Sequence, residues 1–314
     1  MTAARTPELT PQQTLARPVS VRGWGYWSGL EVEVQFHPAA PGTGHVFVRT
    51  DLPAQPRIPV CVGNRIEVPL RTVLAQGTAS VEMVEHILAA LSAAGIDNCE
   101  IRVNRAEMPG MDGSSLAFTQ ALQEAGVERQ QLTRPMLIVN SSVRLGDDAS
   151  WLQAEPANAG EYHVEYQLDY SETPVIGRQT FGLTVNADSF ERELASARTF
   201  LLEREAQWLR QQGLGRHVSL QDILVFDDQG PMENTLRFAD ECVRHKTLDL
   251  IGDLALAGCQ LVGRFTAHRT GHRMNAEMVR KLIHHADLIE AVPVPVSAGE
   301  PEQATEREAI RKIA

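Results

Sequence analysis

Three side chains on one predicted helix are of a kind that binds divalent cations. His245, Asp249 and Asp253 are spaced four residues apart, so they lie along the same side of a helix. Two carboxylates at this spacing repel one another, and a bound cation would remove that repulsion. An imidazole and a carboxylate one turn apart are good ligands for zinc. The alternative interpretation is a solvent-facing polar stripe, in which Arg244 and Lys246 form ion pairs with the acids.

A second pair of chemically active side chains, Glu85 and His86, lies on another predicted helix. A catalytic zinc site usually has three protein ligands and one open position for water. His86 would complete such a set, and Glu85 beside it could act as a general base. Ala89 and Ala90 are small enough to let a partner element approach. Taken alone, Glu85 and His86 could instead be a pair of surface residues.

A third candidate, His272, follows a predicted strand in the segment Arg269-Thr-Gly-His272. The glycine before it, Gly271, would let a reacting group approach the backbone closely, and the imidazole could donate a proton. The alternative is a loop histidine without a catalytic role.

The helices and strands that must position these residues alternate along a chain of 314 residues, which is long enough for two domains. Residues 19–69 contain alternating apolar and polar side chains and predict strands. A helix is predicted from Ser80, as its N-cap, to Gly95, and a strand is predicted over 99–103. A second helix over 115–125 completes this first β/α unit.

The second half of the chain contains the same kinds of element. In order, strands are predicted at 136–143, 150–154 and 161–170, helical periodicity over 188–212, a strand at 222–226, a helix over 238–257, a strand at 260–267 and a helix over 275–288. The segment Leu88–Gly95 and the strand after it resemble Leu250–Gly258 and the strand after it. This similarity predicts two copies of one α+β unit facing each other, and chance similarity between two Ala- and Leu-rich helices is the alternative.

These elements predict an α+β fold in two parts, followed by a tail. The N-terminal α+β domain comprises residues 1–131, and the C-terminal α+β domain comprises residues 132–291. Residues 292–314 contain Pro-Val-Pro-Val and then a charged segment, so we expect a tail there.

Composition and charge exclude several classes of protein. With 43% hydrophobic and 22% charged residues, the chain is typical of a globular protein. A net charge of −11 argues against a general nucleic-acid binder. No stretch reaches the roughly 18 apolar residues that span a bilayer, and Met1–Pro18 lacks the apolar core of a secretion signal, so we expect a cytoplasmic protein. Cys61, Cys99, Cys242 and Cys259 are too scattered for a thiolate zinc cluster or a disulfide framework.

Taken together, these segments resemble the UDP-3-O-acyl-N-acetylglucosamine deacetylases, zinc enzymes that commit a sugar nucleotide to lipid A synthesis in Gram-negative bacteria. The resemblance extends over residues 19–290. The matching motifs are Met83-Val-Glu-His86 with Gly95-Ile-Asp-Asn98, Met111-Asp-Gly-Ser114, Ala197-Arg-Thr-Phe200, Arg244-His-Lys-Thr-Leu-Asp249 with Ile251-Gly-Asp253, and Gly271-His272. The fold that the resemblance implies is two similar β/α sandwich domains, each with a small inserted element, packed face to face with the zinc site between them.

The resemblance also implies a role for each matching residue. The zinc ligands would be His86, His245 and Asp249. The catalytic residues would be Glu85 as general base, His272 as general acid, Asp253 as charge partner of His272, Lys246 near the scissile group, and Thr199 as a stabiliser of the oxyanion. The residues that line the substrate or nucleotide sites would be Phe200, Asp169, Tyr170, Arg269 and Gly271.

The activity that the resemblance implies is hydrolysis of the N-acetyl group of UDP-3-O-(3-hydroxyacyl)-N-acetylglucosamine, which gives acetate and the free amine. The cofactor would be Zn²⁺, although Fe²⁺ could occupy a site of nitrogen and oxygen donors. The partner would be the small acylated UDP-sugar, bound by a monomer without nucleic acid and without stable membrane insertion. The alternatives are a zinc deacetylase of another acetylated sugar and a non-catalytic homologue that binds a sugar nucleotide.

The chain departs from the family pattern at two places that bear on substrate range. Where the family commonly has Gly-Leu-His-(Ser/Thr)-Gly, this chain has Gly25-Tyr-Trp-Ser-Gly29, so Trp27 replaces a histidine. The segment Gly215-Arg-His-Val-Ser219 stands where members of the family have paired glycines beside the acyl-chain passage. The bulkier His217 and Val218 could narrow or redirect that passage.

Overall fold

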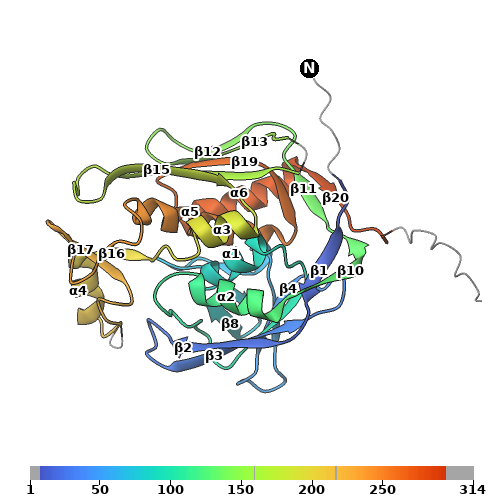
Figure 1. Cartoon of the computed structure of the whole chain (residues 1–314), viewed down its shortest axis with the longest axis horizontal. Coiled ribbons are helices and arrows are strands. Elements are labelled where there is room, and N and C mark those ends of the chain that lie inside the picture. The colour runs from blue at the N-terminus through green and yellow to red at the C-terminus, as the bar shows by residue number, and fades with distance from the viewer. Residues whose placement is uncertain (1–7, 159, 216–217, 295–314) are drawn as a thin grey trace, which may run out of the picture.

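Two sheets enclose a layer of helices in the computed structural model, which describes residues 8–158, 160–215 and 218–294. In Figure 1 the main sheet of the C-terminal half lies at the top, that of the N-terminal half at the bottom, and most of the helices between them. None of the helices in these ranges is long and apolar enough to cross a membrane. The arrangement confirms the predicted α+β class.

The N-terminal half is built on a five-stranded sheet in the order β2-β3-β9-β4-β5. Its strands are β2 (Val19–Trp24), β3 (Glu31–Pro38), β4 (His45–Arg49), β5 (Arg57–Pro59) and β9 (Cys99–Val103). Along β3 the fully buried Val32, Val34 and Phe36 alternate with more exposed residues, as expected of a strand with one face on the core. Phe36 packs edge to face on Phe118 of α2 (Leu116–Ala125), which lies on that inner face.

The C-terminal half is organised around its central strand, β19 (Gln260–His268). The other strands of this sheet are β11 (Met136–Ile138), β12 (Val143–Gly146), β13 (Trp151–Glu155), β14 (Tyr162–Tyr170), β15 (Gly177–Thr184) and β20 (Asp287–Ile289). β19 pairs antiparallel with β13 and parallel with β11 and β14. The helices of this half are α3 (Ala187–Glu193), α5 (Glu241–Leu254) and α6 (His272–His285).

Two buried helices, α1 (Glu85–Ala93) and α5, pack against each other where the two halves meet. Their backbones come very close, because a Cβ added to Gly252 would collide with the backbone of Glu85. Each helix is followed by a glycine with φ of +70°, Gly95 after α1 and Gly258 after α5 and the short 3-10 helix η2 (Ala255–Ala257). Because each glycine leads into a central strand, β9 or β19, the structure contains the helix–glycine–strand repeat that the sequence predicts.

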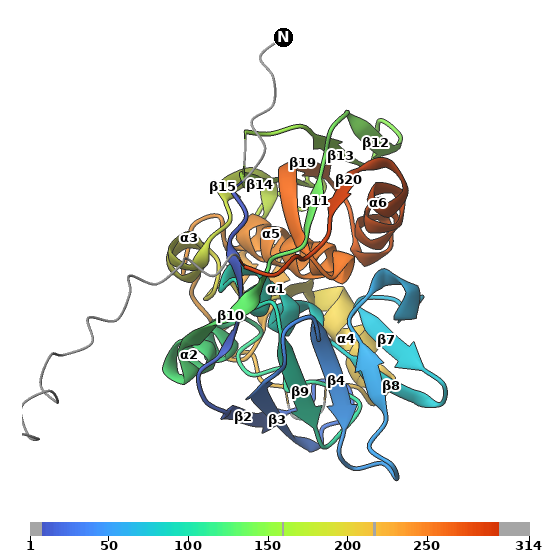
Figure 2. The same cartoon turned by 90° about the vertical axis from the view of Figure 1, so that its right-hand side faces the viewer.

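Each half carries a smaller inserted element that borders the site described below. In the N-terminal half, the 3-10 helix η1 (Val62–Asn64) precedes a three-stranded sheet of β6 (Arg65–Ile66), β7 (Val73–Gln76) and β8 (Ala79–Glu82), which is visible in Figure 2. In the C-terminal half, the insertion comprises β16 (Phe200–Leu202), α4 (Glu203–Gln211), β17 (Leu224–Asp227) and β18 (Gly230–Pro231), at the left of Figure 1. A separate antiparallel pair, β1 (Pro11–Leu15) with β10 (Val127–Thr133), includes the predicted domain boundary after residue 131, which stays a prediction.

Several predicted helices were wrong in their extent. The helix predicted from Ser80 begins only at Glu85, because Ser80 belongs to β8, which pairs with β7 as a hairpin. The helical periodicity over 188–212 is two separate helices, α3 and α4, with the strand β16 between them. The last predicted helix, 275–288, begins earlier, at His272, and ends at His285, because Asp287–Ile289 form β20. Residues 295–314 of the predicted tail lie outside the described ranges.

Candidate metal centre

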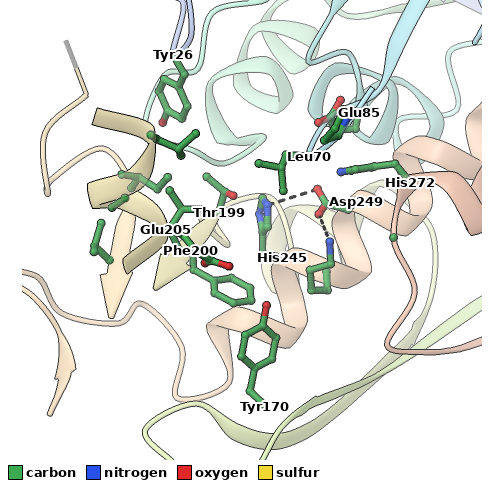
Figure 3. A pocket seen from close by; sticks show the side chains of 18 of the residues that line it. Tyr26, Leu70, Glu85, Tyr170, Thr199, Phe200, Glu205, His245, Asp249 and His272 are labelled. Atoms are coloured by element: carbon green, nitrogen blue, oxygen red, sulfur yellow. Dashed lines mark hydrogen bonds and ion pairs between the residues drawn. The ribbon is translucent and has the colours of Figure 1, made fainter. Parts of the chain in front are cut away.

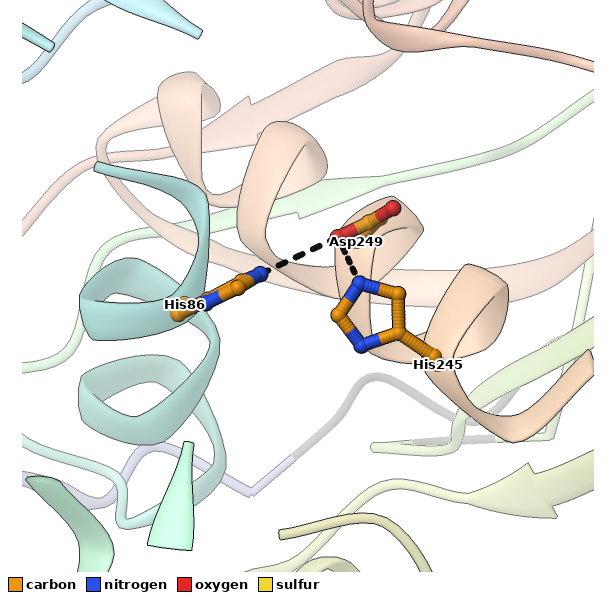
Figure 4. Close-up of side chains that lie close together, drawn as sticks. All are labelled: His86, His245 and Asp249. Atoms are coloured by element: carbon orange, nitrogen blue, oxygen red, sulfur yellow. Dashed lines mark ion pairs between the residues drawn. The ribbon is translucent and has the colours of Figure 1, made fainter. Parts of the chain in front are cut away.

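Two imidazoles and one carboxylate converge at the contact between α1 and α5. His86 is the second residue of α1, and His245 and Asp249 lie one turn apart on α5. Oδ1 of Asp249 is 3.6 Å from Nε2 of His86 and 3.4 Å from Nε2 of His245. One donor atom from each residue lies within 4.8 Å of the others, and all three residues are buried. Figure 4 shows both rings directed at the same carboxylate.

The protonation states of these side chains suit metal binding. Nδ1 of His245 donates a hydrogen bond to the carbonyl oxygen of Ala197 at 3.1 Å, which leaves the lone pair on Nε2 free to face the cluster. Burial lowers the pKa of His245 to about 4, so the ring is neutral. Burial opposes the ionisation of Asp249, but the positive charge of Lys246 holds its pKa well below the usual range. A neutral imidazole and an ionised carboxylate are the forms that bind a cation.

The donor set therefore fits a divalent cation. Imidazole nitrogens and a carboxylate oxygen suit Zn²⁺ and other first-row divalent ions, and three protein ligands leave a position open for water or substrate. The three donors belong to two helices that lie far apart in the sequence. The close approach at Gly252 is what brings those helices together.

Glu85, the predicted general base, is the first residue of α1 and precedes the candidate ligand His86. It is buried, with 4% of its surface exposed. Burial raises its pKa above the ordinary value of a glutamate. One of its oxygens, Oε2, accepts a hydrogen bond from the backbone N–H of Thr72 at 3.1 Å. A carboxylate with a raised pKa is a better proton acceptor near neutral pH than an ordinary one.

His272, the predicted general acid, is held by a buried carboxylate. Its Nδ1 lies 2.8 Å from Oδ2 of Asp253, which is fully buried. Burial alone would lower the pKa of His272, but the charge and hydrogen bond of Asp253 outweigh it and raise the pKa to about 9. The ring is therefore cationic at neutral pH. Asp253 is itself fixed by hydrogen bonds from Asn275 at 2.8 Å and from the Thr72 hydroxyl at 2.5 Å.

Lys246 lies on α5 and Thr199 directly precedes β16, and both line the same site. Nζ of Lys246 donates to Oδ2 of Asp249 at 2.8 Å. Burial alone would lower the pKa of Lys246, but the neighbouring Asp249 carboxylate raises it, so the side chain is an ammonium. The backbone of Thr199 is fixed on both sides, since its N–H donates to Gly113 and its carbonyl accepts from Leu224.

A cavity of about 1050 Å³ joins these groups, and both halves and both insertions contribute to its walls (Figure 3). The predicted site residues that line it are Glu85, His86, Asp169, Tyr170, Thr199, Phe200, His245, Lys246, Asp249, Arg269, Gly271 and His272. Asp253 does not line the cavity and lies behind His272. An apolar part of the wall comes from the second insertion, with Leu209, Leu214, Val218, Ile223 and Val225.

The two departures from the family pattern differ in what the structure describes. Trp27 lines the cavity, with the guanidinium of Arg71 4.6 Å from the centre of its ring. Its indole N–H is buried and has no hydrogen-bond partner among the described residues. Val218 also lines the cavity, whereas His217 lies outside the described ranges.

Sequence reasoning missed residues that act through the backbone or through a distant partner. Thr72 touches both Glu85 and Asp253, yet it stands in a stretch without a motif. Tyr26 is a further example, because its hydroxyl donates to the carbonyl of Asp222, 196 residues away. A buried threonine beside two carboxylates has no spacing signal, so neither contact could be found without the fold.

The fold and the site together define the class: an α+β protein with a large cavity and a candidate metal centre of two histidines and one aspartate. The family model described as UDP-3-O-acyl N-acetylglycosamine deacetylase matches residues 12–284, and the chain belongs to this family.

Relatives of known name agree with this assignment. A UDP-3-O-acyl-N-acetylglucosamine deacetylase of Myxococcus xanthus is 38% identical over 288 residues, which cover 91% of this chain and 91% of the relative. Proteins of the same name from Syntrophotalea carbinolica and Brucella ovis are 35% and 37% identical. Both matches cover 90% of this chain, and they cover 90% and 98% of the two relatives.

Proposed function

We propose that this chain hydrolyses the N-acetyl group of UDP-3-O-(3-hydroxyacyl)-N-acetylglucosamine and releases acetate and the free amine, the committed step of lipid A synthesis. Its family and the names of its relatives support the reaction and the substrate. The observation that carries the proposal is the convergence of His86, His245 and Asp249 on one point of a cavity that Glu85 and His272 also line.

The proposed cofactor is Zn²⁺, with Fe²⁺ as the alternative for this set of nitrogen and oxygen donors. The proposed ligands are His86, His245 and Asp249. When bound, a divalent cation supplies a Lewis acid that polarises a carbonyl group and acidifies water.

Glu85 is the proposed general base. It lines the cavity next to His86, and burial raises its pKa toward the working range. It would take the proton of the water that attacks the acetyl carbonyl, a step to which a positioned base typically contributes about 10²- to 10⁴-fold in rate. The backbone N–H of Thr72 holds one oxygen of this carboxylate in place during the transfer.

His272 is the proposed general acid, because an amine is a poor leaving group unless its nitrogen is protonated. Asp253 keeps the ring cationic at neutral pH and fixes its orientation through Nδ1. The other ring nitrogen, Nε2, would give its proton to the departing nitrogen. Asp253 therefore acts through His272 and does not touch the substrate.

Negative charge that develops on the carbonyl oxygen needs donors in a site from which water is excluded. The Lys246 ammonium and Thr199 both line the cavity and are the proposed donors. A single such donor is typically worth ~3–4 kcal/mol in the transition state. Lys246 also balances the negative charge of Asp249.

The proposed substrate contacts lie around the catalytic groups. Tyr170 and Phe200 pack edge to face with ring centres 5.6 Å apart on the cavity wall, and Asp169, Arg269 and Gly271 line it nearby. The apolar wall of the second insertion would receive the acyl chain, because an alkyl chain gains roughly 0.8 kcal/mol for each CH₂ that it buries.

We further propose that the chain works as a monomer in the cytoplasm, with reduced cysteines. Burial raises the pKa of the Cys99 and Cys242 thiols to about 12, which keeps both protonated and unreactive. Size-exclusion chromatography with light scattering tests the oligomeric state, and cell fractionation tests the compartment.

Acetate release from the acylated sugar nucleotide tests the proposed function directly. We expect turnover by metal-loaded protein and none after chelation, with recovery when Zn²⁺ is returned. Metal-loaded protein that binds this substrate without releasing acetate would refute the proposal and favour a binding homologue.

A second candidate function, deacetylation of another acetylated sugar, is favoured by Trp27 and Val218 on the cavity wall. A panel that compares acylated, non-acylated and non-UDP substrates separates the two. A higher kcat/KM for a non-acylated or non-UDP sugar would favour the second candidate.

A further inference from the structure

Thr72 is a fully buried residue of the first insertion that contacts two proposed catalytic carboxylates, one through its backbone N–H and one through its hydroxyl. It lies directly before β7. Its backbone N–H donates to Oε2 of Glu85 at 3.1 Å, and its hydroxyl donates to Oδ1 of Asp253 at 2.5 Å. Its carbonyl oxygen accepts the N–H of Val84, the residue before α1, at 3.5 Å.

The two carboxylates that Thr72 contacts serve opposite ends of the proposed reaction. Glu85, on α1 in the N-terminal half, is the proposed base, and Asp253, on α5 in the C-terminal half, is the partner of the proposed acid His272. Both carboxyl groups are buried, and buried polar groups are costly unless hydrogen-bond partners satisfy them. Thr72 supplies one donor to each.

The local fold leaves Thr72 little freedom to move. Val73, the next residue, pairs with Glu82 in the β7–β8 hairpin. The chain then turns at Met83, which has a φ of +60°, and enters α1 at Glu85. A non-glycine residue in this left-handed region is strained and persists only where its surroundings enforce it. The hairpin and the turn thus hold Thr72 against the first turn of α1.

We propose that Thr72 is a positioning residue that keeps the general base and the acid's carboxylate partner in register across the two halves of the molecule. The inference rests on the proposed function. Without the hydroxyl, the buried Oδ1 of Asp253 loses its donor, and only the contacts of Oδ2 with Asn275 and His272 still hold the carboxylate. The loss would appear in the chemical step, because Thr72 makes no part of the cavity wall.

The experiment compares Thr72→Val with Thr72→Ser in full-length, zinc-loaded protein. Valine has nearly the same shape and keeps the backbone N–H, whereas serine keeps the hydroxyl. We expect Thr72→Val to lower kcat by roughly 10- to 100-fold, the effect of a lost hydrogen bond to a charged group. KM and the zinc content should stay within about twofold of wild type, and Thr72→Ser should restore most of kcat.

Thr14→Val is the matched control for a purely structural effect. Thr14 is also a buried threonine of the N-terminal half, and its hydroxyl donates to the carbonyl of Asn98 at 2.7 Å, away from the cavity. We expect Thr14→Val to lower the melting temperature about as much as Thr72→Val while leaving kcat unchanged. An equal fall in kcat for both valine variants would overturn the inference, because stability alone would then explain it.

An Asp253→Asn background tests the route through the carboxylate. Since Thr72 acts on His272 through Asp253, Thr72→Val should lower kcat by less than about threefold when Asp253 is already replaced. A full additional loss in this background would overturn the inference.

The proposed function and the role of Thr72 fail in different ways. If wild type releases no acetate, the proposed function is overturned and the catalytic role of Thr72 with it. If wild type is active and Thr72→Val turns over at the same rate, only the inference about Thr72 is overturned.

Discussion

The helices α1 and α5 occupy equivalent places in the two halves, yet they carry the chemistry unequally. After Glu85 and His86, the remaining buried residues of α1 are all apolar. Along its whole length α5 buries Glu241, His245, Asp249 and Asp253. Glu241 accepts a hydrogen bond from Arg198, and His245 donates one to the carbonyl oxygen of Ala197. Asp249 pairs with Lys246, and Asp253 pairs with His272.

The difference between the helices shows that a repeated helix–glycine–strand unit can carry ionisable residues in one copy and mostly apolar residues in the other. Buried ionisable groups are tolerated only where partners satisfy them. The neighbours of α5 supply such partners, and α1 needs them only at its first turn, where it reaches the cavity.

The largest expected effect is the loss of a candidate ligand on α5. We expect His245→Ala to lose bound metal and to slow acetate release by roughly 10³-fold or more, because the donor set and the chemistry fail together. Metal analysis by mass spectrometry and an acetate assay measure both. His284→Ala, at the last turn of α6, is the control and should keep both. Equal metal contents in wild type and His245→Ala would contradict the ligand assignment.

Replacing Glu85 on α1 should lower the rate of turnover without lowering the content of bound metal. We expect Glu85→Gln to slow turnover by about 10²- to 10⁴-fold while bound metal stays at the wild-type level, because the amide keeps the shape but cannot take a proton. The same two assays apply. Turnover within about threefold of wild type would mean that another group is the base.

The pH dependence of kcat should reflect the pair that Asp253 of α5 forms with His272 of α6. His272 must be protonated to donate, and its pKa is raised to about 9, so we expect kcat to fall as the pH rises through about 9. Asp253, Glu85 and Asp249 supply the negative charge that raises this pKa against the effect of burial. Asp253→Asn should therefore move the alkaline limb of the pH–rate profile to lower pH. An unmoved limb would assign it to another group.

The smallest expected effect concerns the glycine turn that follows the buried helix in each half, and it tests whether the two turns contribute equally to stability. Gly95 and Gly258 have the same φ of +70°, and a Cβ at either would meet only ordinary contacts. We expect Gly95→Ala and Gly258→Ala to destabilise the fold by a similar amount, roughly 1–2 kcal/mol each, through the left-handed conformation alone. Urea unfolding measures both. If one variant lost much more free energy of unfolding than the other, the stability of the fold would depend more on the glycine turn of that half.

Much of the site could be predicted from sequence because its residues lie in short motifs on buried helices. The spacing of His245 and Asp249 indicates a shared helix face, and the structure brings both beside His86. The extent of α1 could not be predicted in the same way. Val81 fits a helical apolar face, but it fits equally the buried face of β8, and pairing with β7 decides between them.

Contacts between distant segments explain the remaining differences. The helical pattern over 188–212 is interrupted between α3 and α4, where Arg198 forms a buried ion pair with Glu241 at 2.8 Å. Thr72 escaped prediction for a similar reason, since its partners Glu85 and Asp253 are 13 and 181 residues away. Local periodicity contains no information about such pairs.

One consequence of the ligand arrangement concerns the thermodynamics of the whole chain. Because the candidate donors come from both halves, an ion bound there would act as a reversible crosslink that exists only in the folded state. By mass action, free metal at a hundred times its dissociation constant would add about 2.7 kcal/mol to the free energy of unfolding. The midpoint of thermal unfolding would therefore rise with the concentration of the ion, and a chelator titration followed by calorimetry would read out the affinity of the site without any substrate.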